Sequence, residues 1–352
     1  MKRRKSFLQR WPLWLLLLLI LASVNFVSLP YYVEIPGSTE PLDERVIVQG
    51  KTGRDQGELM FTTVFSLSAS PYTWLYGKLA PHAKIVPKQT RLGRVRSPES
   101  YQRLLEWMRD DSEASAMIAA LRVLNKPVQL NYEGVIIQYF LENAPSAKLL
   151  YEGDIVTAVE GSPVKTTDDL KTVLAGKKPG DKAAVTVKRG SRTETLQVPL
   201  MELDDAAGKR TGFGFGYSTV QVPIHQEDIR FDLNDIGGPS AGFMIALEIV
   251  SQYEGGTLPR GYKVAGTGTV DADGTIGQIG GIDHKIITAA KSGADYFILP
   301  RNVNPTDRNE TDARAAYEKL GKTKMQLLPV STLAEAVETL KKLPAASPTG
   351  SR

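Results

Sequence analysis

The chain has 352 residues, of which 42% are hydrophobic and 23% charged, and its formal net charge is +4. This length is enough for two domains with a sizeable core. Five basic residues and no acidic residue lie in the first 30 positions, and 38 basic and 39 acidic residues remain after them. No basic face is left for nucleic acid, so we expect no nucleic-acid partner. Cysteine is absent, which excludes a cysteine nucleophile and thiolate zinc sites, and we expect no metal or other cofactor.

The N-terminal region contains an uncharged apolar run, WPLWLLLLLILASVNFVSL, at residues 11–29. As a helix, a run of this length spans roughly 30 Å of hydrocarbon. Because the basic residues lie on its N-terminal side, a cytoplasmic N-terminus is favoured. The sequence therefore predicts a basic cytoplasmic segment at residues 1–10, a transmembrane helix at 11–30 and an external body. A cleaved signal peptide is the alternative, although no small-x-small cleavage site precedes Pro30.

The region up to Pro127 is predicted to mix strands and helices. The runs YYVEIP, RVIVQG and GELMFTTVFSLS are strand-like and are separated by Gly and Pro. Farther along, Ser97 is a suitable N-cap and Pro98 a suitable first residue of a helix. The spacing of the apolar residues then predicts one or two helices before Pro127.

Residues 127–202 have the pattern of a separate unit. A strand, GVIIQYF, leads through a short loop to GDIVTAVEG, a capped helix at TTDDLKTVLAG, and two alternating strands joined by a turn at residues 189–191. Their order and spacing resemble a bacterial PDZ domain, and the matching residues are YEGVIIQYFLENAPSAKLLYEGDIVTAVEGSPV and KKPGDKAAVTVKRG. The resemblance implies that an extended peptide binds by adding a strand to a sheet edge.

Within this unit, the turn YEGV matches the carboxylate-binding turn of the family, since its glycine permits a close backbone approach. The predicted peptide-binding residues are Glu133, Gly134, Val135 and Ile136. A buried strand with no binding role is the alternative for GVIIQ. After the unit, we expect a polar loop at residues 201–212, followed by strands at FGFGYSTVQVPIH and DIRFDL.

Ser240 begins an apolar run in the stretch DIGGPSAGFMIALEIV. Gly237 and Gly238 allow a tight turn, and Pro239 suits the first position of a helix. Ser240 is therefore predicted to lie in the first turn of a helix, where N–H groups can stabilise an oxyanion. A serine that only helps to cap the helix is the alternative.

A serine nucleophile needs a base within hydrogen-bond reach, and histidine is the first option. The segment GPSAG fits the pattern G-x-S-x-G, in which an acid and then a histidine follow the serine. His284 is the only histidine after Ser240, and the acid would be Asp271, Asp273 or Asp283. That arrangement needs a central parallel sheet before the serine, where the PDZ-like unit occupies much of the chain.

Lysine is the second option for the base. Asp283 is a suitable cap for a helix that has Lys285 in its first turn. The helix dipole and burial both disfavour a cation there, so they lower the pKa of the lysine from roughly 10.4 toward that of a general base. Lys291 lies in the last turn and is predicted to be a solvated surface residue, and His284 lies about 100° away around the helix.

Two blocks carry a second resemblance. The segment GGPSAG and, after TG at residues 267–268, the segments GQIGGIDHK and AAKSGADYFILP resemble the proteolytic domain of Lon-type proteases, over roughly residues 212–300. The resemblance implies a dyad in which Ser240 is the nucleophile and Lys285 the general base. Thr267 would supply a hydroxyl that orients the lysine. The other supporting residues are Gly238, Pro239 and Ala241.

The chain departs from the Lon pattern in three respects. Gly237 stands where the family often has an aspartate, and Asp235 lies two positions earlier. No phosphate loop of the form G-x-x-x-x-G-K-[ST] occurs, so we expect no ATPase motor and no ATP. An apolar N-terminal segment and a PDZ-like unit are present instead. This arrangement resembles the membrane-anchored, PDZ-containing Lon-type proteases of bacteria, and it implies a location in the bacterial plasma membrane.

The predicted fold is α+β, with an N-terminal transmembrane helix and a PDZ domain inserted into, or preceding, a Lon-type proteolytic domain. If the PDZ domain is inserted, residues 31–126 are the first part of the protease domain and residues 203–343 are its catalytic part. Residues 344–352 are predicted to be a flexible tail. The competing interpretation makes residues 31–126 a free-standing domain.

The predicted function is that of an ATP-independent, membrane-anchored serine endopeptidase. Its substrates would be extracytoplasmic proteins or peptides that the PDZ domain recognises. Because Lon-type domains often work in rings, the resemblance also implies a homo-oligomer. The alternative is a non-catalytic scaffold, in which a protease-like body supports PDZ-mediated binding at the membrane.

Overall fold

A computed structural model gives the fold. The structure describes residues 14–15, 26–48, 57–92, 95–205, 208–224, 228–233, 238–321 and 323–346. The predicted cytoplasmic segment 1–10, and most of the predicted span 11–30 and of the predicted tail 344–352, lie outside these residues. Within the described ranges, no helix has the length and apolar character needed to cross a membrane. The transmembrane helix therefore stays a prediction.

The chain divides into two compact units. Unit 1 contains residues 1–38 and 63–93, and unit 2 contains residues 39–62 and 94–352. Residues 31–126, which we expected to be one segment of the protease domain, are thus divided between the two units.

Unit 1 is built from β1 (Tyr31–Pro41), the second half of β3 (Glu58–Ser68), β4 (Lys84–Pro87) and two helices. Strand β1 pairs antiparallel with β4. Helix α2 (Pro71–Leu79) begins at a capping box in which Ser70 and Thr73 bond reciprocally. Helix α3 (Lys88–Leu92) follows β4 directly. The sequence predicts β1 and β3 but not α2, β4 or α3.

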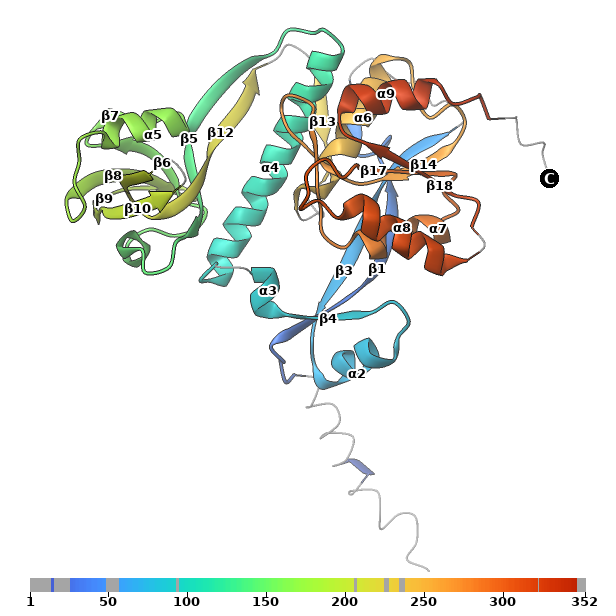
Figure 1. The fold of residues 1–352 in the computed structure, drawn as a ribbon, viewed down its shortest axis with the longest axis horizontal. Helices are drawn as coiled ribbons and strands as arrows, with labels where there is room; N and C mark the ends of the chain where they lie inside the picture. The colour runs from blue at the N-terminus through green and yellow to red at the C-terminus, as the bar shows by residue number, and fades with distance from the viewer. Residues whose placement is uncertain are drawn as a thin grey trace, which may run out of the picture. The chain divides into compact units, whose positions relative to one another are not determined.

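Unit 2 contains a parallel sheet in the order β18, β17, β14, β3 (Figure 1). Its later strands are β14 (Lys263–Gly266), β17 (Tyr296–Pro300) and β18 (Gln326–Val330). The helices of this part are α4 (Pro98–Val123), α6 (Gly242–Tyr253), α7 (Ile282–Lys291), α8 (Asn309–Leu320) and α9 (Leu333–Lys341). Ser97 caps α4 and Pro98 is its first residue, as predicted.

Alternating residues of this sheet enter two different cores. Leu59, Phe61 and Val264 belong to the core that includes residues of α4, α6 and α9. Met60 and Ala265 belong to the core that includes residues of α7 and α8. Because helices cover both faces of parallel strands, this part is of the α/β type. With the antiparallel sheet described next, the chain is a mixed α/β protein, whereas we had expected the α+β class.

The PDZ-like part of unit 2 is an antiparallel sheet in the order β12, β5, β6, β8, β9. Its strands are β5 (Gln129–Phe140), β6 (Ile155–Val159), β8 (Lys182–Arg189), β9 (Arg192–Pro199) and β12 (Phe215–Ile224), and short β7 (Ser162–Pro163) pairs with β6. A 3-10 turn, η2 (Pro145–Lys148), and helix α5 (Thr167–Leu174) complete it. Thr166 caps α5 through a capping box, as its sequence predicted.

The PDZ-like part extends past the predicted boundary at residue 202. Strand β12 pairs with β5 along its whole length, and Phe213 and Phe215 lie in the core of this part. The predicted loop at residues 201–212 is instead a hairpin of β10 (Met201–Asp205) and β11 (Gly208–Gly212). The physical reason is alternation, because Met201 packs against the core of this part and Leu203 is buried, whereas Glu202 between them and Asp204 after them are exposed.

Segments from both sides of the PDZ-like part build one core. Short strand β2 (Val46–Val48) pairs with β13 (Ile229–Phe231), and α4 packs against α6. Buried Leu121 of α4 shares this core with Leu247 of α6. An inserted PDZ domain predicts such a shared core. Strands β15 (Thr269–Val270) and β16 (Ile276–Gly277) form a small hairpin in the same part of the chain.

Candidate active site

Ser240 lies in a single 3-10 turn, η3 (Pro239–Ala241), immediately before helix α6. Gly238 has a φ of 85°, a left-handed conformation that glycine adopts without strain, and it reverses the chain ahead of Pro239. No side chain caps η3 or α6, so the capping role considered for Ser240 has no support here. Gly237 and Asp235, which mark the departure from the Lon pattern, lie outside the described residues.

The backbone of Ser240 is bound to the segment that follows strand β14. Its carbonyl oxygen accepts hydrogen bonds from the Gly268 N–H and the Thr267 hydroxyl, both at 3.0 Å. The Phe243 N–H donates in turn to the Gly268 carbonyl at 3.1 Å. A Cβ at Gly268 would lie only 3.2 Å from the Cβ of Phe243, so glycine permits this close approach. Residues 267–268 therefore hold the turn that carries Ser240.

Lys285 comes from the first turn of helix α7. This helix begins after Gly281, whose φ of 69° is left-handed, and it has no side-chain cap. The prediction that Asp283 caps the helix is therefore wrong, since Asp283 is already the second helical residue. The Lys285 side chain is only 4% exposed. Burial lowers the pKa of the Lys285 ammonium to about 7.

Three oxygen atoms surround the Lys285 Nζ, each at 2.9 Å. They are the Thr62 carbonyl oxygen, the Thr267 Oγ1 and the Ser240 Oγ. The Thr62 carbonyl can only accept, and the Thr267 hydroxyl donates its proton to the Ser240 carbonyl, so it too accepts from the lysine. A neutral amine has two N–H groups and one lone pair. With both N–H groups directed at the threonines, the lone pair is left for the Ser240 hydroxyl proton.

The two threonines lie side by side because of the sheet register. Phe61 of β3 is opposite Gly266 of β14 in a parallel pair, and Thr62 and Thr267 each follow by one residue. Ligand sites of parallel sheets are commonly found toward the carboxyl ends of the strands. The Thr62 hydroxyl also donates to the Gly266 carbonyl at 3.2 Å, which links the two strands at this level.

Lys285, and not its neighbour His284, is the residue that reaches the serine. His284 is 1% exposed, and within the described residues neither ring nitrogen has a hydrogen-bond partner. Asp283 approaches the His284 Nδ1 only to 3.5 Å. The structure therefore gives no support to the Ser–His–acid alternative. Lys291 is exposed, as its position in the last turn predicted.

Two groups at the site were not identified from the sequence. The Thr62 carbonyl has no signal in the sequence, because every residue type has a backbone carbonyl. Ser112 of α4 donates its hydroxyl proton to the Pro239 carbonyl at 3.3 Å. A Cβ at Gly242 would lie 2.5 Å from the Ser112 Oγ, so α4 packs directly on the turn that holds Ser240.

The predicted peptide-binding residues 133–136 lie in the middle of the PDZ-like sheet. Val135 is opposite Thr219 of β12 on one side and Val156 of β6 on the other, and Ile136 is flanked in the same way. A Cβ at Gly134 would lie 2.5 Å from the Val156 carbonyl oxygen, so this glycine accommodates a neighbouring strand. Both edges of β5 are therefore paired at Val135 and Ile136, which leaves no free edge there for an added strand, and peptide binding at Glu133 and Gly134 stays a prediction. The buried-strand alternative is confirmed, since Val135 and Ile136 are at most 1% exposed.

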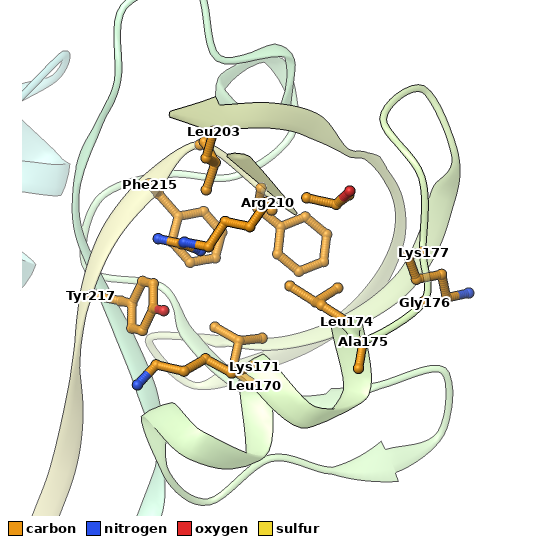
Figure 2. Close-up of a pocket in the computed structure, with 14 residues that line it drawn as sticks. Leu170, Lys171, Leu174, Ala175, Gly176, Lys177, Leu203, Arg210, Phe215 and Tyr217 are labelled. Carbon is orange, nitrogen blue, oxygen red and sulfur yellow. The ribbon is translucent and has the colours of Figure 1, made fainter. Parts of the chain in front are cut away.

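A different groove of the PDZ-like part, of about 220 Å³, lies between α5 and the segment entering β12 (Figure 2). Its apolar lining is Leu170, Leu174, Leu203, Phe213, Phe215 and Tyr217, and its cations are Lys171, Lys177 and Arg210. Strand β12 is the end strand of the sheet order. The Gly214 carbonyl faces β5, because it accepts a hydrogen bond from the Leu141 N–H. Successive residues of a strand direct their backbone groups to opposite edges, so the N–H and C=O of Phe215 face the outer edge of β12.

Comparison with known proteins matches two families to the chain, one after the other along the sequence. Residues 120–200 match the PDZ domain family, and residues 218–342 match the Lon protease (S16) C-terminal proteolytic domain. Lon protease of Fervidobacterium nodosum is 33% identical over 145 residues, which are 41% of this chain and 16% of that protein. Lon protease of Neorickettsia sennetsu is 34% identical over 100 residues, 28% of this chain and 11% of that protein.

Further similarities are to a DegP-like protease and to a solved PDZ domain. The probable periplasmic serine endoprotease DegP-like of Brucella suis is 35% identical over 78 residues, 22% of this chain and 15% of that protein. A solved PDZ domain of an SdrC-like protein from Listeria monocytogenes is 26% identical and covers 25% of this chain and 92% of that one, with a TM-score of 0.23. The chain spans less than a fifth of the length of these curated relatives. The similarities to Lon and DegP-like proteases support a serine endopeptidase.

The role of Thr267 as a positioning residue yields a prediction. In Thr267→Val, the lysine loses one acceptor and the Ser240 carbonyl loses one donor, while the side-chain shape is kept. We expect kcat for peptide-bond cleavage to fall about 10- to 100-fold, the cost of one or two lost hydrogen bonds in the transition state, with KM little changed. Steady-state kinetics on a peptide substrate measures both quantities.

Thr267→Ser is the matched control, since it keeps the hydroxyl, and it should restore most of the lost kcat. A merely structural role for Thr267 predicts the opposite ranking. In that case the valine variant, with its better shape match, would retain more activity than the serine variant.

Proposed function

We propose that the protein is a serine endopeptidase with a Ser–Lys dyad. The observation that carries the proposal is the position of the Lys285 Nζ, 2.9 Å from the Ser240 Oγ, with two further acceptors for its N–H groups. A pKa of about 7 makes a substantial fraction of the amine neutral at neutral pH. This is the condition under which lysine acts as a general base toward serine.

In the acylation step, the Lys285 lone pair takes the Ser240 hydroxyl proton as the Oγ attacks the carbonyl carbon of the substrate. The resulting ammonium has three N–H groups, and the third is aimed at the reacting centre. It donates that proton to the leaving amine as the peptide C–N bond breaks. Lys285 is then neutral again and activates a water molecule, which hydrolyses the ester and returns the proton to Ser240.

Stabilisation of the oxyanion is assigned to backbone N–H groups of the segment from Gly238 through Pro239 and Ser240 to Ala241. Proline has no N–H, so the donors come from the other residues. The start of a helical turn presents N–H groups without intrahelical partners, and the dipole of α6 adds positive potential at the same end.

The groove beside β12 is the proposed site of substrate recognition by the PDZ-like part. An extended segment of a protein or peptide would pair with the outer edge of β12 and place apolar side chains against the wall formed by α5. Lys171, Lys177 and Arg210 at the groove favour a segment with acidic groups or a terminal carboxylate.

ATP independence and location complete the proposal. The sequence has no phosphate loop, so the hydrolase is proposed to work without ATP. Residues 11–30 are proposed to anchor the chain once in a bacterial plasma membrane, with basic residues 2–5 on the cytoplasmic side and the catalytic body outside. Because the chain is similar to Lon proteases, the proposal includes assembly into a homo-oligomer.

Cleavage assays test the catalytic proposal. The full chain in detergent, without ATP, is expected to cut a reduced, unfolded protein, and Ser240→Ala and Lys285→Met are expected to lose at least about a thousandfold in kcat/KM. Because only the neutral amine is a base, kcat/KM should rise about tenfold per pH unit below pH 7 and level off above it. Fragment mass spectrometry across a pH series measures both effects.

Lys291→Met is the matched control, since it removes an exposed lysine from the same helix and should leave the rate unchanged. A wild-type chain that binds the unfolded protein without cutting it would support the scaffold alternative. Cleavage that appears only when ATP is added would contradict ATP independence.

A separate prediction concerns the groove. Tyr217→Pro removes a backbone N–H from the end strand β12, where proline is otherwise tolerated. We expect KM for the unfolded protein to rise about tenfold, the effect of losing one or two hydrogen bonds from an added strand, with kcat unchanged. Tyr217→Phe keeps the N–H and should behave as wild type, and equal KM values for the two variants would contradict strand addition at this edge.

A further inference from the structure

Helix α2 of unit 1 exposes an apolar stripe. Tyr72, Leu75, Tyr76 and Leu79 are 39%, 51%, 51% and 76% exposed. Their spacing of three and four residues places them along one face of the helix. A surface helix normally turns such a stripe toward its own core, so the outward direction of this one requires a reason.

The opposite face of α2 is already packed on the strands of unit 1. Gly77 is the buried residue of the helix, and a Cβ there would lie 2.8 Å from Val33 of β1 and 3.2 Å from Ile85 of β4. Since glycine allows this close approach, the helix is held with its small-residue side inward. Rotation of the apolar stripe into the unit would bring large side chains into a space that has no room for them.

The apolar run at residues 11–29 ends at the same place. The Leu29 N–H donates to the Ala69 carbonyl at 2.7 Å, and the Ala69 N–H donates to the Tyr31 carbonyl at 2.9 Å. Ala69 directly precedes Ser70, the N-cap of α2. On the other side, the Lys88 N–H donates to the Pro30 carbonyl at 3.0 Å. The end of the run is thus fixed to the beginning of α2.

The composition of this region fits a lipid–water boundary. Phe26 and Val27, in the last part of the run, are 88% and 52% exposed, and unit 1 also exposes Phe65 and Leu67 of β3. On α2, Tyr72 and Tyr76 belong to the exposed stripe, and Lys78 is exposed as well. Tyrosine and tryptophan are enriched at membrane interfaces, and lysine extends toward anionic headgroups.

We propose that the exposed face of α2, formed by Tyr72, Leu75, Tyr76 and Leu79, docks on the lipid bilayer. The inference rests on the membrane anchor of the proposed function and adds a second contact to it. Because the anchor would enter the bilayer beside α2, the helix is held at high local concentration near the lipid, and a small apolar face is sufficient. The docked helix would hold unit 1 against the membrane surface.

The absence of cysteine allows a direct test. In the full chain, Leu79→Cys is labelled with a polarity-sensitive fluorophore, and Val303→Cys, at a 67% exposed position in unit 2, is the matched control. Each protein is reconstituted into vesicles of phosphatidylcholine and phosphatidylglycerol, with plain or brominated acyl chains. We expect the emission from residue 79 to shift to the blue and to be quenched by the brominated chains, and the emission from residue 303 to do neither.

Flotation of the same vesicles separates this inference from the anchor. Protein that floats with the vesicles while the label at residue 79 stays unquenched would overturn docking and leave the anchor standing. Protein that does not float would overturn both. A blue shift at residue 79 without quenching by brominated lipid would show that a second copy of the chain covers the face, and it would also overturn docking on lipid.

Discussion

The burial of the Lys285 amine among three oxygen atoms is the constraint on which the site depends. Lys285 is 4% exposed, and none of the three atoms at 2.9 Å belongs to a carboxylate, so its charged form is disfavoured. A fall of one in its pKa corresponds to about 1.4 kcal/mol of preference for the neutral form. The same burial opposes folding with a charged lysine and favours the neutral amine that the proposed mechanism requires. The two threonine oxygens decide the direction in which the lone pair points.

Most of the surrounding architecture holds this arrangement in place. The parallel register of β3 and β14 sets Thr62 beside Thr267, and the Thr267–Gly268 segment binds the turn that carries Ser240. Helix α4, which precedes the PDZ-like part in the chain, supports the same turn through Ser112. The groups of the candidate site thus come from both sides of the PDZ-like part in the chain, since Thr62 and Ser112 precede it and Ser240, Thr267 and Lys285 follow it.

The positions of Ser240 and Lys285 at helix starts were predictable because their signals are local, whereas their pairing was predicted from the resemblance to Lon-type proteases. A Gly-Pro-Ser turn ahead of an apolar helix, and a lysine in the first turn of a second helix, both follow from short-range rules, and the structure brings Ser240 and Lys285 together. The Thr62 carbonyl was not predictable, because its role depends on strand register. The pairing of GVIIQYF was not predictable for a related reason: the segment does form a strand, but its residues do not reveal that both of its edges are paired at Val135 and Ile136. The hairpin at residues 201–212 was missed because Met201 and Leu203 are too few to mark a strand among polar neighbours.

The proposed mechanism requires a substantial neutral fraction of the Lys285 amine near pH 7, and the titration of this lysine is the most direct measurement of it. In protein labelled with ¹³C at the lysine Cε, the resonance of Lys285 is identified by its absence from Lys285→Met and followed between pH 5 and 11, a window that spans both the lowered pKa and the ordinary value of roughly 10.4. The account predicts a midpoint near 7, well separated from the other lysines. A midpoint near that ordinary value would contradict it, because the amine would then be a cation whenever Ser240 had to lose its proton.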